Sequence, residues 1–241
     1  MREIMTRYGR HNIGFLWLFV EPMIFTLFVT ALWNATGAAH GSELPITAFA
    51  ITGYSTVLLW RNMPGRCIAA VNPNLSLMYH RNVKVLDIFF SRLALEAFGA
   101  TTSFIVLSAV FGSLGYLQPP EDILKVAQGW VLTIFFGSSL AILLGALSEE
   151  FELVEKLWHP VSYITFPLSG AAFLVSLLPP TAQEVVLYLP MVHGVEMVRE
   201  GYFGSKIHAH YDAAYVATIS SILMLLGLAY TSRISKRVIP E

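Results

Sequence analysis

Long apolar runs alternate with short polar stretches along the whole chain of 241 residues. A helix needs about 20 apolar residues to cross the hydrocarbon core of a bilayer. In lipid a helix satisfies its own backbone hydrogen bonds, and the strict alternation of transmembrane β-strands is absent. The pattern therefore predicts an all-α integral membrane protein, with one domain over residues 1–241 and six transmembrane helices. The expected spans are residues 13–33, 44–60, 88–111, 123–147, 157–178 and 212–230.

The connection between the fifth and sixth spans is too long for a simple turn. It opens with Pro179 and Pro180, and it contains the apolar stretch VVLYLPMVHGVEMV, which Pro190 and Gly194 interrupt. Apolar segments of about 10–14 residues are typical of re-entrant or interfacial segments. A re-entrant outer segment over 179–200 is favoured, because broken backbone is tolerated at membrane depth beside protein or a cavity. The alternative is an amphipathic helix lying flat on the outer leaflet.

Composition supports the membrane class and gives an orientation. The chain is 55% hydrophobic and only 13% charged, whereas charged residues make up about a quarter of a soluble domain. With the N-terminus in the cytoplasm, only Lys125, Arg199 and Lys206 among the fifteen Lys and Arg residues lie outside. This distribution obeys the positive-inside rule and predicts that both termini are cytoplasmic. The acidic residues of 149–155 also fall inside, but acidic residues contribute little to topology.

The first twelve residues precede the first span and alternate basic residues with apolar ones. We expect them to form an N-terminal interfacial helix on the inner leaflet, with a plain basic anchor as the alternative. The apolar run that follows, Ile13 to Trp33, contains Glu21 and is longer than the roughly 7–15 apolar residues of a signal peptide. It is therefore interpreted as a retained span.

Charge gathers in one cytoplasmic stretch, MYHRNVKVLDIFFSR, between the second and third spans. A short helix over about 75–85 would place Arg81 and Lys84 on neighbouring positions of one face, and Asp87 could pair with Lys84. Basic loops at this position often do no more than set topology and contact lipid head groups. Composition alone leaves both interpretations open.

Few other polar residues are candidates for function inside the spans. Glu21 either faces a pathway or bonds to a neighbouring helix, because intramembrane carboxylates are costly and need a partner. Glu96 and Arg92 have the spacing of an i, i+4 ion pair. Trp17 and Tyr163 could stack against sugar rings in a conduit, although aromatic residues commonly face lipid or form interfacial belts.

Motifs for chemistry are missing from the sequence. There is no G-x-x-x-x-G-K-[ST] phosphate loop, no H-E-x-x-H and no G-x-S-x-G. His208 and His210 lack a third ligand motif, so no metal site is expected, and the lone Cys67 excludes an internal disulfide. An intramembrane hydrolase using Ser169 with His159 or His193 is a remote alternative.

Three stretches resemble the permease subunits of capsular-polysaccharide exporters, which belong to the type-two ABC transporters. LMYHRNVKVLDIFFSRLALE resembles their loop and third-helix start, and FVEPMIFTLFVTALW resembles their first helix. YLPMVHGVEMVREGYFG resembles their outer loop, with a proline–histidine–glutamate–arginine pattern. The likeness covers nearly the whole chain in order.

The resemblance implies a homodimer that moves lipid-linked capsular polysaccharide across a bacterial inner membrane. Two cytoplasmic ABC ATPase subunits would bind ATP and Mg, while this chain would hold no cofactor and bind no nucleic acid. A periplasmic or outer-membrane export partner would receive the polymer. Permeases for O-antigen, teichoic acid or drugs share the architecture and stay open as alternatives.

Three sets of site residues are predicted, and the resemblance underlies the first and the last of them. The cytoplasmic coupling helix would contact the ATPase through Arg81, Val83, Lys84, Leu86 and Asp87. A pathway would include Trp17, Glu21 and Tyr163. An outer gate would be formed by Pro179, Pro180, Pro190, His193, Glu196 and Arg199.

Overall fold

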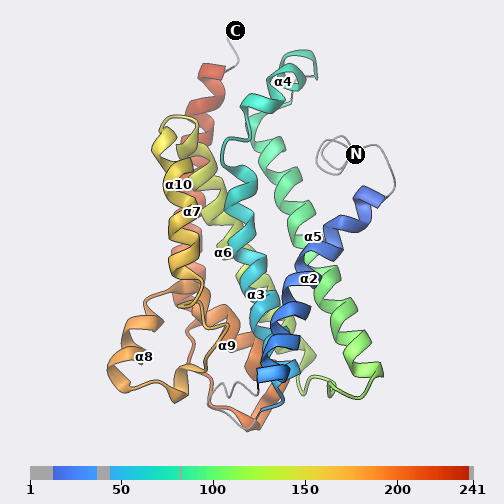
Figure 1. Ribbon diagram of the computed structural model, residues 1–241. Helices are drawn as coiled ribbons and strands as arrows, with labels where there is room; N and C mark the ends of the chain where they lie inside the picture. Colours follow the sequence, from blue (N-terminus) through green and yellow to red (C-terminus); the bar gives the residue numbers. More distant parts are fainter. Residues whose placement is uncertain (1–12, 37–43, 82, 239–241) are drawn as a thin grey trace.

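The computed structural model describes residues 13–36, 44–81 and 83–238, and every regular element in these ranges is a helix (Figure 1). The expected N-terminal interfacial helix over 1–12 lies outside the described residues. The helices are α2 (Ile13–Thr36), α3 (Ile46–Cys67), α4 (Leu75–Arg81), α5 (Val85–Ser113), α6 (Ile123–Ser148), α7 (Glu152–Thr165), α8 (Pro180–Leu187), α9 (Pro190–Phe203) and α10 (Ala213–Val238). Three short 3-10 turns are η1 (Asn72–Asn74), η2 (Val175–Leu177) and η3 (Gly204–Lys206).

The helices run between two ends of the molecule. The short α4, the α6–α7 connection and the end of α10 lie at one end, drawn at the top of Figure 1, and α2 begins in the same half of the molecule. The α5–α6 connection, α8 and α9 lie at the other end. The distribution of Lys and Arg predicts the same division of the connections between two sides. We call the end with α4 and the α6–α7 connection the elbow end, and the other end the α9 end.

Three of the described helices are long and apolar enough to cross a membrane: α5, α6 and residues Ala213–Ser235 of α10. They correspond to the third, fourth and sixth expected spans. The second expected span, α3, is more polar because it contains residues such as Thr52, Thr56 and Arg61. Most of α3 is buried by its neighbours, so its threonine hydroxyls bond carbonyl oxygens of their own helix rather than facing lipid.

The fifth expected span is wrong in its second half. The helix begins at Glu152, earlier than expected, and ends at Thr165, so the short 3-10 helix η2 is the only helical element between residues 166 and 178. Pro167 has no backbone N–H to continue the helical hydrogen bonds, and Gly170 adopts a φ of +85° that favours glycine. At about 1.5 Å per residue, the 14 residues of α7 reach about 21 Å, less than a bilayer core of about 30 Å.

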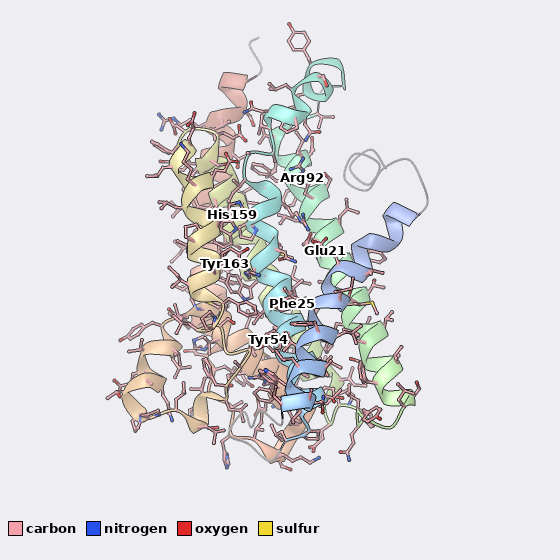
Figure 2. The ribbon with its side chains drawn as sticks, in the orientation of Figure 1. Glu21, Phe25, Tyr54, Arg92, His159 and Tyr163 are labelled. Atoms are coloured by element: carbon pink, nitrogen blue, oxygen red, sulfur yellow. The ribbon has the colours of Figure 1, made fainter. Side chains whose placement is uncertain are left out.

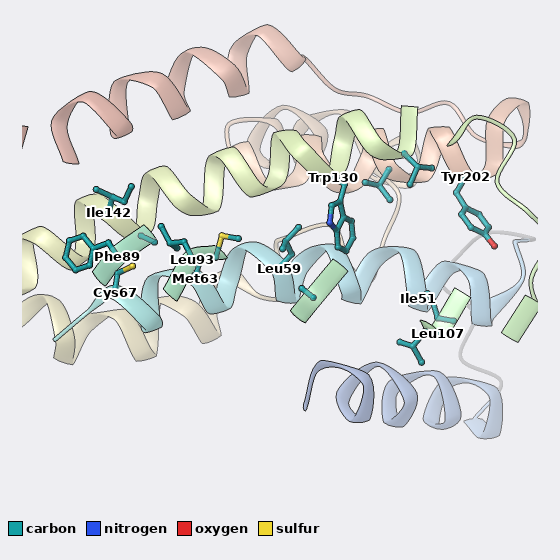
Figure 3. Packing of buried hydrophobic residues seen from close by; sticks show 14 of the residues in the cluster. Ile51, Leu59, Met63, Cys67, Phe89, Leu93, Leu107, Trp130, Ile142 and Tyr202 are labelled. Carbon is teal, nitrogen blue, oxygen red and sulfur yellow. The ribbon is translucent and has the colours of Figure 1, made fainter. Parts of the chain in front are cut away.

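The core lies along α3 and α6, which pack against each other and against most of the other helices. Figure 3 shows this cluster from the elbow end, with Cys67, Phe89 and Ile142, to the α9 end, with Trp130 and Tyr202. Small residues permit the close approach of these helices, as is usual in membranes. A Cβ at Gly129 of α6 would lie 2.9 Å from the backbone nitrogen of Val198 in α9.

Gly129→Ala is expected to destabilise the protein by about 1–3 kcal/mol, because the added methyl group meets backbone atoms that must move. Gly112→Ala, at the last residue but one of α5, is the matched control, since a Cβ there meets nothing within 4 Å, and it should change stability little. Thermal unfolding of both variants in detergent measures the difference. A melting temperature of Gly129→Ala equal to that of Gly112→Ala would contradict this account of the α6–α9 contact.

Candidate functional site

The elbow end carries the residues that we expect to contact the ATPase, but they are arranged differently from the sequence prediction. The helix predicted over 75–85 ends at Arg81, and Lys84 instead forms the N-cap of α5. Arg81 and Lys84 therefore do not share a helix face, which corrects the sequence interpretation. The side chain of Arg81 lies outside the described residues.

Asp87 acts first as a helix cap. Its Oδ2 accepts a hydrogen bond of 2.9 Å from the backbone N–H of Lys84, in the first turn of α5. Carboxylates are favoured at this position because the first N–H groups of a helix have no partner within it. The same turn leaves the Lys84 side chain exposed, while Val83 packs against the core and Leu86 is half-buried.

The segment leading into α4 is fixed to the end of α6. The backbone N–H of Ala69 donates to Ser148 Oγ at 3.1 Å, and that of Val71 donates to Glu149 Oε1 at 3.2 Å. Ala69 adopts a φ of 51°, an uncommon angle for a residue with a Cβ. Burial raises the pKa of the Glu149 carboxyl, and the hydrogen bond from Val71 opposes that rise. Two hydrogen bonds thus hold the segment that leads into α4 to the end of α6.

A second link joins three helices near the elbow end. Arg66 of α3 lies 2.8 Å from Glu96 Oε2 of α5 and 3.6 Å from Glu21 Oε2 of α2. Arg92 donates to the backbone oxygen of Arg66 at 2.8 Å. Glu96 therefore pairs across helices, a contact that the i, i+4 spacing with Arg92 did not indicate. Glu21 bonds to a neighbouring helix and still has 47% of its side chain exposed.

Aromatic rings line the surface between α2 and α7. The rings of Phe25, Tyr54 and Phe166 form a triangle with centroid distances of 5.7–5.8 Å. The guanidinium of Arg61 lies over the rings of Tyr163 and Phe166, about 5 Å from each centroid. Tyr163 is 68% exposed, and Figure 2 shows it with Phe25 and Tyr54 on the same side of the molecule as Glu21. The side chain of Trp17 lies outside the described residues.

The proline residues assigned to the outer gate begin helices. Pro179 is the N-cap of α8 and Pro180 its first residue, while Pro190 is the first residue of α9. Proline suits these positions because the first N–H groups of a helix have no partner within it. The chain breaks between the two helices at Tyr188 and Leu189, next to Pro190, whereas Gly194, the other interruption expected from the sequence, lies inside α9.

Arg199 of α9 is fully buried and holds the irregular segment that follows α7. Its two terminal nitrogens donate hydrogen bonds of 2.6 Å to three carbonyl oxygens, those of Gly170, Ala171 and Phe173. Its guanidinium also lies 3.7 Å from the centre of the Phe49 ring. A Cβ on Gly53 of α3 would collide with this guanidinium, so glycine is required there.

Glu196 lies one turn earlier on the same face of α9 and is also fully buried. Its carboxylate accepts from the backbone N–H of Val175, before α9, at 3.3 Å. It also accepts from the N–H of His210, after α9, at 3.1 Å. One carboxylate thus joins the chain segments on both sides of the helix.

His193 lies one turn before Glu196 on α9, and it also forms hydrogen bonds to the backbone. Its Nδ1 accepts from the N–H of Asp212 at 2.8 Å, so Nε2 carries the proton and donates to the oxygen of Leu187 at 2.8 Å. Ser169 donates to the oxygen of Phe166. Because both groups are occupied by backbone, they are not arranged as the base and nucleophile of a hydrolase. Within the described residues no cluster of potential metal ligands occurs.

Arg199→Lys is expected to lower the free energy of unfolding by about 3 kcal/mol or more. A single ammonium group cannot reach all three carbonyl oxygens that the guanidinium binds, so buried carbonyl oxygens would lose their donors. Arg233→Lys, at a residue with 58% of its side chain exposed, is the matched control. Thermal unfolding and the monodisperse fraction after detergent extraction report the effect. Equal melting temperatures for the two variants would contradict the anchoring role of Arg199.

Comparison with known proteins identifies the family of this chain. A family model described as ABC-2 type transporter matches residues 1–203. The chain is 44% identical over its full length to the capsule polysaccharide export inner-membrane protein CtrC of Neisseria meningitidis serogroup B, covering 91% of that protein. It is 41% identical over its full length to the capsule polysaccharide export inner-membrane protein BexB of Haemophilus influenzae, again covering 91%.

A more distant relative is the polysialic acid transport protein KpsM of Escherichia coli, at 22% identity over 95% of this chain and 89% of that protein. The relatives are named as export or transport proteins and not as enzymes. The family model and the full-length relatives together show that this chain is a membrane permease of the ABC-2 type transporter family.

Proposed function

We propose that this chain is the transmembrane subunit of an ATP-driven exporter that moves lipid-linked capsular polysaccharide outward across a bacterial inner membrane. The observation that carries the proposal is full-length identity of 44% and 41% to capsule polysaccharide export inner-membrane proteins. Three helices of suitable length and apolar composition support the membrane location. The names of the relatives favour capsule polysaccharide over O-antigen, teichoic acid or drugs as the substrate.

The fuel for export comes from a separate subunit. The chain has no phosphate loop, so ATP and Mg are assigned to two cytoplasmic ABC ATPase subunits. The elbow end supplies a docking surface, in which α4 protrudes beyond the helix bundle (Figure 1) and the side chain of Lys84 is exposed. The hydrogen bonds to Ser148 and Glu149 connect this surface to α6, and α6 packs against α3, α9 and α10.

The polymer passes between two copies of the chain. The surface between α2 and α7 suits such a path, because it combines aromatic rings with charged groups. Tyr163 and Glu21 are both accessible there, and flat rings can stack against the apolar faces of sugars. The polymer then passes to a periplasmic or outer-membrane partner.

The α9 end forms the outer gate as a re-entrant pair of helices. α9 is held by the buried side chains of His193, Glu196 and Arg199, so it is the fixed half of the pair. α8 carries the exposed Val185, and Tyr188 at its end is 76% exposed. We assign the moving half of the gate to α8 for this reason.

Cysteine labelling tests the orientation. Cys67 is buried and is the only cysteine, so Cys67→Ser provides a background without other thiols. In cells with a permeabilised outer membrane, a membrane-impermeant maleimide is expected to label Tyr188→Cys but not Tyr79→Cys, where Tyr79 is 82% exposed at the elbow end. Tyr79→Cys should react only after the inner membrane is disrupted. The reverse labelling pattern would invert the proposed topology.

Charge reversal tests the docking surface. The double variant Arg81→Glu with Lys84→Glu is expected to reduce surface polysaccharide on the order of tenfold, because losing charged contacts at an interface costs about 2 kcal/mol or more. Membrane insertion should be unchanged, and co-purification with the ATPase should be lost. Arg233→Glu, also at the elbow end but on α10, is the control. Normal surface polysaccharide in the double variant would contradict the docking assignment.

A further inference from the structure

An apolar groove opens between α5 and α6 in their halves nearest the α9 end. Its volume is about 720 Å³. α3 packs against both helices, whereas α5 and α6 make few direct contacts with each other. The groove therefore exists because α5 and α6 both pack against α3 but do not pack closely against each other. The connection at 117–120 closes it at the α9 end.

Two closely packed aromatic rings form the centre of the groove, and the hydroxyl of Ser108, which also lines it, is buried without a hydrogen-bond partner in the described part of the chain. The rings of Phe104 and Trp130 stack with centroids 4.6 Å apart and an interplanar angle of 20°. The indole N–H of Trp130 donates to Thr101 Oγ1 at 2.8 Å, which satisfies both groups. The rim residues Ile105 and Val131 are 60% and 63% exposed. These exposed apolar side chains lie on two of the helices suited to cross the membrane, so the groove opens toward lipid.

A cation lies beside the closed end of the groove. Lys206 Nζ donates to Gln118 Oε1 at 3.2 Å, and Gln118 lines the groove. The backbone oxygen of Gln118 accepts from Tyr202 Oη, another lining residue. Lys125 at the same end is paired with Glu200 at 3.2 Å, whereas Lys206 makes no ion pair with any residue that the structure describes. Lys206 therefore offers a positive charge that no carboxylate neutralises directly.

We propose that this groove binds one acyl chain of a resident anionic glycerophospholipid, with its phosphate at Lys206. A phospholipid combines an apolar chain with a charged phosphate, in the same order in which the groove presents apolar residues and then a cation. A helix about 10 Å wide would fill the volume with only about six residues, so the groove suits a slender chain better than a helix of a second copy. Its place in the outer leaflet rests on the proposed orientation.

Native mass spectrometry of the purified chain tests the proposal, with phosphatidylglycerol and phosphatidylcholine titrated into delipidated protein. The wild type is expected to retain one phospholipid and to prefer phosphatidylglycerol. Ala127→Trp places a large ring in the groove from an exposed lining position, and it should weaken phospholipid binding at least about tenfold. Ala214→Trp, at an exposed alanine of α10 near the same end, is the matched control and should bind like the wild type.

Lys206→Gln separates the headgroup from the chain. It is expected to keep phospholipid binding but to remove the several-fold preference for phosphatidylglycerol. Unchanged lipid binding in Ala127→Trp would overturn the site, and an unchanged headgroup preference in Lys206→Gln would overturn the role of the cation. A disulfide between two copies carrying Ala109→Cys in the Cys67→Ser background would also overturn it, because a second protomer would then cover the groove. None of these measurements depends on transport, so their failure is distinct from failure of the proposed function.

Discussion

The structure depends on how it satisfies backbone groups where the chain leaves a helix inside the protein. After α7 the chain is irregular through Ala171 and Phe173, and its carbonyl oxygens turn toward the interior. An unpaired buried carbonyl is costly in a surrounding that offers no water. Arg199 supplies the donors for three of these oxygens, and Gly53 leaves the space that its guanidinium occupies. A full charge is therefore buried to make the irregular segment after α7 possible.

The same constraint gives α9 its position. Glu196 accepts hydrogen bonds from the chain segments before and after α9, so it ties both segments to the helix. α9 packs into the bundle against α3 and α6. α8 has fewer contacts and exposed side chains. The pair thus divides into an anchored helix and a peripheral one, a division that suits a gate because one half provides a fixed frame for the other.

The elbow end and the α9 end are connected through α6. At the elbow end Ser148 and Glu149 bind the segment that carries α4. Toward the α9 end, glycines of α6 and α9 bring the two helices into direct backbone contact. If an ATPase displaced α4, the displacement would act on α6, which packs against α3, α9 and α10. Arg66 adds a second connection, since it joins α2, α3 and α5 beside the same elbow.

The sequence by itself determined the class of protein, the positions of most helices and the family. Apolar length, the distribution of Lys and Arg, and the break around Pro190 are local properties, so they can be read along the chain. The stretch around Arg81 and Lys84 and the pattern from Pro190 to Arg199 also indicated the family that the comparisons show.

Only the tertiary structure decided which charged groups meet. Glu96 pairs with Arg66 of α3, although its spacing along α5 indicated only Arg92 as a partner. Lys84 caps the start of α5, although the sequence predicted that it continues the preceding helix. Arg199 looked like an outer charge, yet it is fully buried because carbonyl oxygens from residues 26–29 positions earlier surround it. Such contacts depend on distances between helices that are far apart in sequence, and spacing along one helix carries no information about them.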